Sequence, residues 1–158
     1  MNSSSLVLLA SALAPVVLMA SAVLLSLAPG VRGGPVWRPF RVLSAAALLC
    51  ALATPLLHRA LPAPGAAEYA IAGLPGLAST PLSAWMAALV QLLGTVIGVF
   101  SSRYLQGEPG QARYVSAFAG VLAAVHLLLL ADHWVVLVAG WALAGAALQQ
   151  LLCFYPER

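Results

Sequence analysis

Two apolar runs separated by a short polar break decide the fold of this chain. Residues 114–154 read YVSAFAGVLAAVHLLLLADHWVVLVAGWALAGAALQQLLCF, and the break lies at Asp132-His133. Each run supplies about the 20 residues that a helix needs to cross a hydrocarbon core of roughly 30 Å. A lone apolar strand in lipid would leave its backbone donors and acceptors unpaired, so both runs are predicted to be transmembrane helices.

The same pattern extends toward the N-terminus. Hydrophobic residues make up 63% of the 158 residues and charged residues only 7%, too few to build a water-soluble surface. We therefore predict an all-α integral membrane protein, a single domain over residues 1–158 with about five transmembrane helices embedded in lipid. The predicted spans are residues 6–28, 40–57, 82–102, 114–131 and 134–154, with an external loop at 61–80.

The arginines predict the orientation, because loops on the cytoplasmic side carry an excess of Lys and Arg. Five arginines lie in the first and third interhelical loops, whereas the second loop carries Arg59 alone. The N-terminus is therefore predicted outside and the C-terminus in the cytoplasm. No basic cluster with interleaved aromatic residues is present, so a nucleic-acid partner is not expected.

The third predicted span carries polar and small residues along one stripe: Gln91, Thr95, Gly98 and Ser102, with Gly94 beside it. Small residues at this spacing let a neighbouring helix approach closely, and Gln91 or Thr95 could donate a hydrogen bond across the contact. The alternative is a hydrated path that touches Gln91. At the start of this span, Thr80 is expected to cap the helix ahead of a proline at the first helical position.

His126 is the one ionisable side chain well inside the fourth span, which makes it a candidate for proton transport. The alternative is a neutral histidine that packs in the bundle by donating to a backbone carbonyl. Asp132 stands before the fifth span and is predicted to cap it by accepting from the amides of its first turn. Two neighbouring ligands, Asp132 and His133, do not make a metal site, so neither a metal nor another cofactor is expected.

Four motifs carry a resemblance to a known family. They are R-Y-L-Q-G-E-P-G-Q-A-R-Y at 103–114, L-L-L-A-D-H at 128–133, G-W-A-L-A-G at 140–145 and L-Q-Q-L-L-C-F-Y-P-E-R at 148–158. The first three resemble the antiporter-like subunits shared by respiratory complex I (subunit 5 or chain L), Mrp antiporters and DAB-type inorganic-carbon complexes. The last resembles the DAB branch most. The resemblance covers the chain from about Leu77 to its end, and the first two spans match only by hydropathy.

The resemblance implies a function. It implies the N-terminal part of a cation-translocating subunit, for protons or sodium, in the bacterial plasma membrane. The leading interpretation is a DAB-type inorganic-carbon uptake complex, in which the partner would be a soluble carbonic-anhydrase-like subunit that handles carbon dioxide or bicarbonate. The alternative is a structural or assembly subunit of a respiratory NADH:quinone oxidoreductase, with other complex subunits as partners. No nucleophile–base pair, metal cluster or nucleotide-binding loop is present, so the chain is not expected to be an enzyme.

One position departs from the resembled family. Complex I and Mrp relatives open the fifth span with Gly-Trp-Glu, whereas this chain has Gly140-Trp141-Ala142. Gln149 returns to within about 20° of Ala142 on a helix of 3.6 residues per turn. A glutamine can pass hydrogen bonds to water but cannot hold a proton, so the lost carboxylate puts proton transport through this span in doubt. Gln149 remains a candidate polar residue of the membrane interior.

Overall fold

A computed structural model describes residues 3–28, 36–60 and 76–154 of the chain. Apart from one isolated antiparallel bridge between Leu77 and Ala131, the regular structure in these ranges is helical. Five of the helices are long and apolar enough to cross a membrane, which confirms the predicted fold class. They are α1 Ser3–Leu27, α2 Trp37–Ala60, α3 Pro81–Tyr104, α4 Gln111–Leu130 and α5 Trp134–Leu152.

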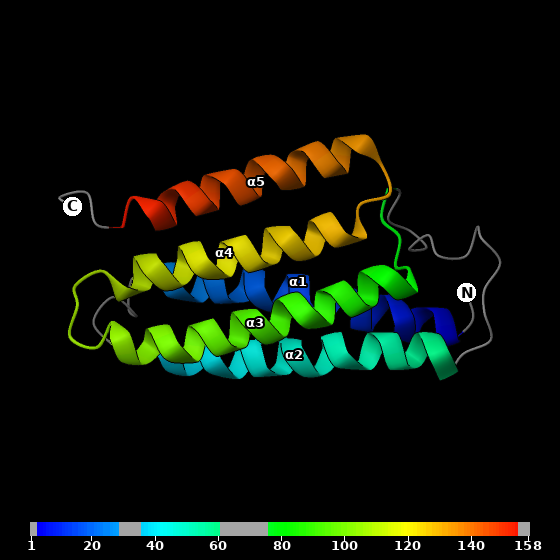
Figure 1. Cartoon of the computed structure of the whole chain (residues 1–158), viewed down its shortest axis with the longest axis horizontal. Helices are drawn as coiled ribbons and strands as arrows, with labels where there is room; N and C mark the ends of the chain where they lie inside the picture. The colour runs from blue at the N-terminus through cyan, green and yellow to red at the C-terminus, as the bar shows by residue number, and fades with distance from the viewer. Residues whose placement is uncertain (1–2, 29–35, 61–75, 155–158) are drawn as a thin grey trace.

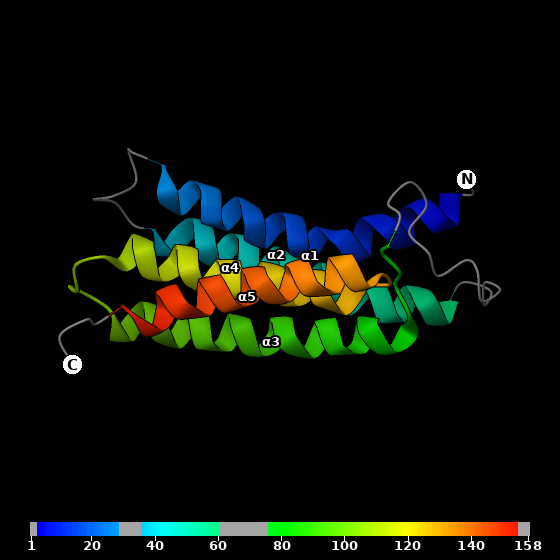
Figure 2. The same cartoon turned by 90° about the horizontal axis from the view of Figure 1, so that it is seen from above.

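The helices run side by side as an up-and-down bundle (Figure 1). Helix α4 is central, because it packs against α1, α3 and α5, while α2 joins α1 to α3. Seen from above, α1 and α3 lie on opposite sides of the bundle (Figure 2). Helix α5 lies at one edge and packs mainly on α4. Helices α1 to α4 thus form the core of the bundle, and α5 packs on the outside of this core.

We call the end of the bundle at which α3 begins the Thr80 end, and the opposite end, with the turn 105–110, the turn end. Of the five arginines in the described residues, Arg59 lies at the Thr80 end and the other four at the turn end: Arg38, Arg41, Arg103 and Arg113. The charge asymmetry used to predict orientation is therefore present in three dimensions. Which end faces the cytoplasm stays a prediction.

The second helix is longer than the predicted span 40–57. It runs from Trp37 to Ala60 and contains Pro55 in its interior. A proline there removes one backbone hydrogen bond without ending a membrane helix, since neighbouring groups can satisfy the freed carbonyl. Most of the predicted external loop 61–80 lies outside the described residues. Its last residues, 76–78, pair with the segment between α4 and α5.

The start of α3 confirms the predicted cap. The Ser83 amide donates to the Thr80 hydroxyl at 3.1 Å, and the Thr80 amide donates to the Ser83 hydroxyl at 2.9 Å. The two bonds form a reciprocal capping box with Pro81 in the first turn. The box fixes where α3 enters the bundle and so sets the height of its polar stripe.

Aromatic side chains fill the turn end. Rings of Phe40 and Phe118 lie 5.9 Å apart between centroids, and Trp37 meets Phe40 edge-on at 6.0 Å. Tyr114 stacks on Phe118 at 6.1 Å and receives the edge of Phe154 at 5.5 Å. We call these five residues the aromatic core. It packs the bundle tightly between the mid-membrane region and the turn end.

Candidate functional site

A buried polar cluster joins three helices at the middle of the bundle. It consists of Ser44 from α2, Gln91 and Thr95 from α3, and His126 from α4. Gln91 is 0% exposed and His126 is 2% exposed. In a bilayer these groups have no water to replace a missing partner, so each must be satisfied within the protein.

The donor and the acceptor of each hydrogen bond in the cluster can be assigned. Gln91 Nε2 donates to the Ser44 hydroxyl at 3.1 Å and to the Ser44 carbonyl at 3.2 Å, which leaves Gln91 Oε1 as an acceptor. His126 Nε2 lies 2.8 Å from Oε1 and therefore donates to it. Thr95 donates to the Gln91 carbonyl at 2.8 Å, so the Ser44 hydroxyl is the donor in its 2.9 Å contact with Thr95.

The cluster thus carries hydrogen bonds from His126 through Gln91 and Ser44 to Thr95 and back to the α3 backbone. This arrangement links α2, α3 and α4 and uses up the donors of all four side chains. It brings together two residues predicted as candidate sites, Gln91 and His126.

Two glycines let the neighbouring helices close around the cluster. A Cβ at Gly94 would lie 2.6 Å from the Leu122 Cδ2 atom of α4. A Cβ at Gly98 would lie 2.5 Å from the Phe40 Cε1 atom of α2. Both positions therefore need glycine for close approach, as the small-residue stripe predicted. The same stripe supplies hydrogen bonds on one side of α3 and close packing on the other.

The predicted cap at Asp132 is wrong. The N-cap of α5 is His133, whose Nδ1 accepts from the Val135 amide at 3.2 Å. The backbone explains the difference, because the Asp132 amide donates to the Gly76 carbonyl at 2.7 Å and the Ala78 amide to the Leu130 carbonyl at 2.8 Å. This pairing holds Asp132 in the connection, and the helix begins one residue later.

Gln149 does not join the cluster. It lies on α5, where both Gln149 and Ala142 are exposed. Within the described residues, no atom lies within 4 Å of a Cβ built at Gly145 on the same helix. The three candidate residues of the sequence therefore separate into a buried pair, Gln91 and His126, and an exposed third.

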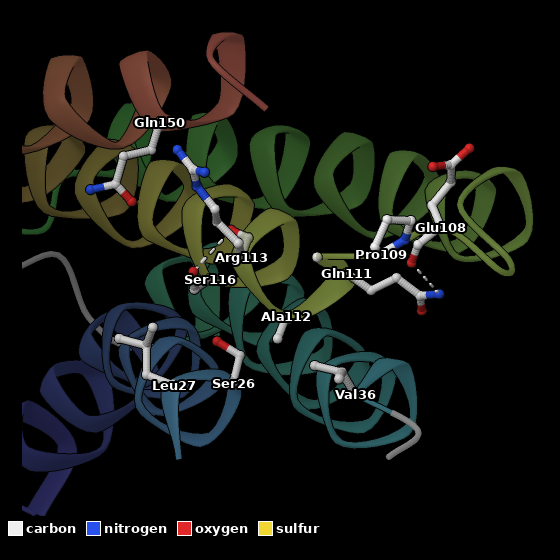
Figure 3. Close-up of a pocket in the computed structure, with 11 residues that line it drawn as sticks. Ser26, Leu27, Val36, Glu108, Pro109, Gln111, Ala112, Arg113, Ser116 and Gln150 are labelled. Carbon is white, nitrogen blue, oxygen red and sulfur yellow. Dashed lines mark hydrogen bonds between the residues drawn. The ribbon is translucent and has the colours of Figure 1, made fainter. Parts of the chain in front are cut away.

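A second polar site, which the sequence did not predict, lies at the turn end. It is a pocket of about 540 Å³ bordered by α1, the start of α2, the turn 105–110, the start of α4 and α5. Figure 3 places Arg113 and Gln150 at one end of the pocket and Glu108 at the other. The remaining polar side chains in its lining are Ser26, Gln111 and Ser116.

This pocket has no single chemical preference. Ser26 and Ser116 donate to carbonyls of their own helices, Val23 at 2.7 Å and Arg113 at 2.9 Å. Arg113 supplies a positive charge and Glu108 a negative one, so the pocket does not select the sign of an ion. Gln150 follows the candidate Gln149 in sequence. The two side chains point in different directions from α5, and only Gln150 borders the pocket.

The described residues contain no group of three or more His, Cys, Asp or Glu side chains that could hold a metal ion. The chemistry of the two polar sites is therefore that of hydrogen bonding and, at the pocket, of two isolated charges.

Comparison with known proteins shows what parts of this chain are similar to. The family model described as NADH-Ubiquinone oxidoreductase (complex I), chain 5 N-terminus, matches residues 75–115, which include all of α3 and its polar stripe. The F(420)H(2) dehydrogenase subunit L of Methanosarcina mazei is 31% identical over 78 residues, 49% of this chain and 12% of that protein. No solved structure gives a significant match.

Two further relatives agree with that match. The NADH-quinone oxidoreductase subunit L of Mycobacterium tuberculosis is 31% identical over 83 residues, 52% of this chain and 13% of that protein. The subunit of the same name from Buchnera aphidicola is 30% identical over 74 residues, 47% of this chain and 12% of its own. The matches thus span only about an eighth of each relative. Residues 75–115 thus resemble the N-terminus of complex I chain 5, and about half of this chain resembles part of the subunits L named above.

Proposed function

We propose that this N-terminal portion of an antiporter-like subunit serves a complex I-type quinone oxidoreductase as a structural and assembly element. The observation that carries the proposal is the match of residues 75–115 to the N-terminus of complex I chain 5. The named relatives are subunits of an NADH-quinone oxidoreductase and of an F(420)H(2) dehydrogenase. Other membrane subunits of such a complex are therefore the proposed partners, and the bacterial plasma membrane is the proposed location.

The composition of the spans supports a structural role. The chain contains no lysine, and in the described part of the chain the acidic residues, Glu108 and Asp132, lie outside the five helices. Proton conduction needs groups that take up and release protons, and Ala142 stands where the resembled family carries an intramembrane carboxylate. The hydrogen bonds of the buried cluster link three helices. Such a cluster orders a bundle even where nothing is conducted through it.

The inorganic-carbon function has less support. Its basis is the closing motif at 148–158, of which residues 155–158 lie outside the described part of the chain. The relatives carry the names of oxidoreductase and dehydrogenase subunits, which favours the NADH:quinone alternative. A carbonic-anhydrase-like partner belongs to this less supported proposal.

Affinity purification tests the two against each other. A tagged chain is expressed at its native level, and the membranes are solubilised in a mild detergent. Subunits of a quinone-linked dehydrogenase are expected to co-purify, with an untagged strain as the control. Recovery of a soluble zinc carbonic-anhydrase-like protein in their place would transfer the chain to the inorganic-carbon class.

Substitution of His126 tests the structural role. In the intact complex, His126→Leu is expected to leave cation transport and membrane insertion unchanged, because leucine is easily accommodated in an apolar span. Transport is measured as acidification of the lumen in inverted membrane vesicles, with equal amounts of complex in both samples. A loss of transport at an unchanged amount of complex would make His126 a proton carrier and would contradict the proposal.

A further inference from the structure

In the part of the chain that the structure describes, the second ring nitrogen of His126 has no hydrogen-bond partner. Nε2 donates to Gln91, so Nδ1 of the neutral ring is an acceptor. Among the described residues, no hydrogen bond reaches this nitrogen, yet every fully enclosed side-chain nitrogen or oxygen there does have one. Nδ1 must therefore border a space that is not filled by protein atoms, although the His126 residue is only 2% exposed.

A small cavity provides that space. It has a volume of about 10 Å³ and is lined by His126, by apolar residues and by three residues with hydroxyl groups. The hydroxyl groups belong to Thr54, Ser79 and Ser83. A volume of about 10–15 Å³ holds one water molecule when two or more polar partners line it. Size and lining both fit a single water.

The hydroxyls of the cavity can serve such a water. Thr54 donates to the Cys50 carbonyl at 2.9 Å, which leaves its oxygen free to accept. Ser79 lies 3.1 Å from His58 Nε2, and His58 is in the last turn of α2 at the Thr80 end. A water that donates to His126 Nδ1 would have Thr54 and Ser79 as its other partners. Ser79 in turn leads to the half-buried His58.

The opposite direction is closed. Beyond Gln91 and Ser44 the bundle is filled by the aromatic core, where Phe40 is 2% exposed and Phe118 is 7% exposed. The Gln91 amide passes a hydrogen bond but cannot take up a proton, so nothing continues from the cluster toward the turn end. In the described residues, the hydrogen bonds that run from His126 toward the turn end thus stop at Thr95 and the α3 backbone.

We propose that this cavity is a hydration site, in which one water molecule binds His126 Nδ1 and connects the buried cluster to the Thr80 end of the bundle through Ser79. The site gives His126 contact with water from one side of the membrane and none from the other. The inference does not depend on which complex the chain serves, and it is compatible with a cluster that conducts nothing.

Solid-state NMR of the full chain in lipid bilayers tests the site. The three histidines, His58, His126 and His133, are labelled with nitrogen-15, and the signal of His126 is assigned by its loss in His126→Leu. Magnetisation is then transferred from water to the rings. We expect transfer to the His126 ring in the unsubstituted protein, at a rate comparable with that of His58. An absence of transfer to His126 would overturn the proposal.

A matched pair of variants locates the water. Ala51 borders the cavity and is 1% exposed, so Ala51→Val places two methyl groups where the water would bind. Ala45 lies on the exposed face of the same helix, so Ala45→Val adds the same volume outside the bundle. We expect transfer to His126 to fall several-fold in Ala51→Val and to persist in Ala45→Val.

An unchanged transfer rate in Ala51→Val would overturn the assignment of the water to this cavity. Should Ala51→Val fail to insert, Ala87→Val fills the same cavity from α3 and is subject to the same two outcomes.

Discussion

Helices α4 and α5 are neighbours of nearly equal length and similar apolar composition, yet they have different surroundings. Half of the α4 span is buried in the protein (50%), against 6% of the α5 span. Lipid tails are as apolar as leucine, so apolar sequence does not distinguish a core helix from an edge helix in a membrane. Small residues and paired polar groups do distinguish them. Helix α4 has His126 bonded to Gln91, whereas α5 is buried only at Gly140, against Leu128.

The largest expected effect comes from placing a charge on α5. An acidic side chain at mid-membrane costs about 2.5–3.5 kcal/mol on insertion scales unless a cation, hydrogen bonds or water offset it. Ala142 is exposed on α5, and no basic residue lies within the spans near it, so Ala142→Glu is expected to reduce the yield of inserted protein. Quantification of membrane-integrated protein measures the yield, with Ala142→Ser as a control of similar size. Normal insertion with increased proton flux would mean that a hydrated path runs past α5.

The next effect contrasts two glycines. Gly98→Val is expected to destabilise the bundle by roughly 1–3 kcal/mol, because its Cβ would overlap the buried Phe40 ring and overpack the core. Gly145→Val adds the same atoms where nothing lies within 4 Å in the described residues. Thermal unfolding in detergent, followed by circular dichroism, compares the two variants. Equal loss of stability would show that α5 is covered as closely as the core.

A third contrast concerns two glutamines. Gln91→Leu removes the acceptor of His126 and the donor to Ser44, and is expected to cost about 1–2 kcal/mol, the range for hydrogen bonds between membrane helices. Gln149→Leu on the exposed face of α5 is expected to stay within about 0.5 kcal/mol, as surface substitutions usually do. Unfolding in a mixed-micelle denaturant series measures both free energies. A larger loss of unfolding free energy in Gln149→Leu than in Gln91→Leu would contradict the assignment of α3 to the core of the bundle and of α5 to its edge.

The smallest contrast concerns the two helix starts. Thr80→Ala breaks the capping box of α3 and is expected to cost about 1 kcal/mol. Asp132→Ala is expected to change stability little, since His133 provides the cap of α5. The same unfolding measurement compares these two variants. A greater loss in Asp132→Ala would restore the carboxylate as the cap.

Much of this fold could be predicted from the sequence, and for a definite reason. Chain segments without charge must be helices in lipid, so the number and type of the elements follow from composition alone. The stripe at Gln91, Thr95 and Gly98 also predicted the face of α3 that packs, because small and polar residues are uncommon on a lipid-facing surface.

The features that the sequence did not predict depend on contacts between residues that are distant in sequence. The partner of Gln91 depends on the height at which α4 passes α3, and no local pattern fixes that height. Asp is a residue type that commonly caps helices, so the sequence favoured Asp132 as the cap. The backbone of Asp132 is instead paired with Gly76, which is distant in sequence. The pocket of Figure 3 is made by four separate segments of the chain, and its Gln150 is distinguished from Gln149 only by rotation about α5.

The backbone pairing between residues 76–78 and 130–132 has a consequence for biogenesis. A chain is made from its N-terminus, so residues 76–78 are in place well before 130–132 leave the ribosome. Their two hydrogen bonds can form only when α4 has crossed the bilayer and delivered its C-terminal end to the Thr80 end. A chain in which α4 stalled would leave Asp132 on the opposite side of the membrane. The pairing therefore closes only in molecules in which α4 has crossed the bilayer.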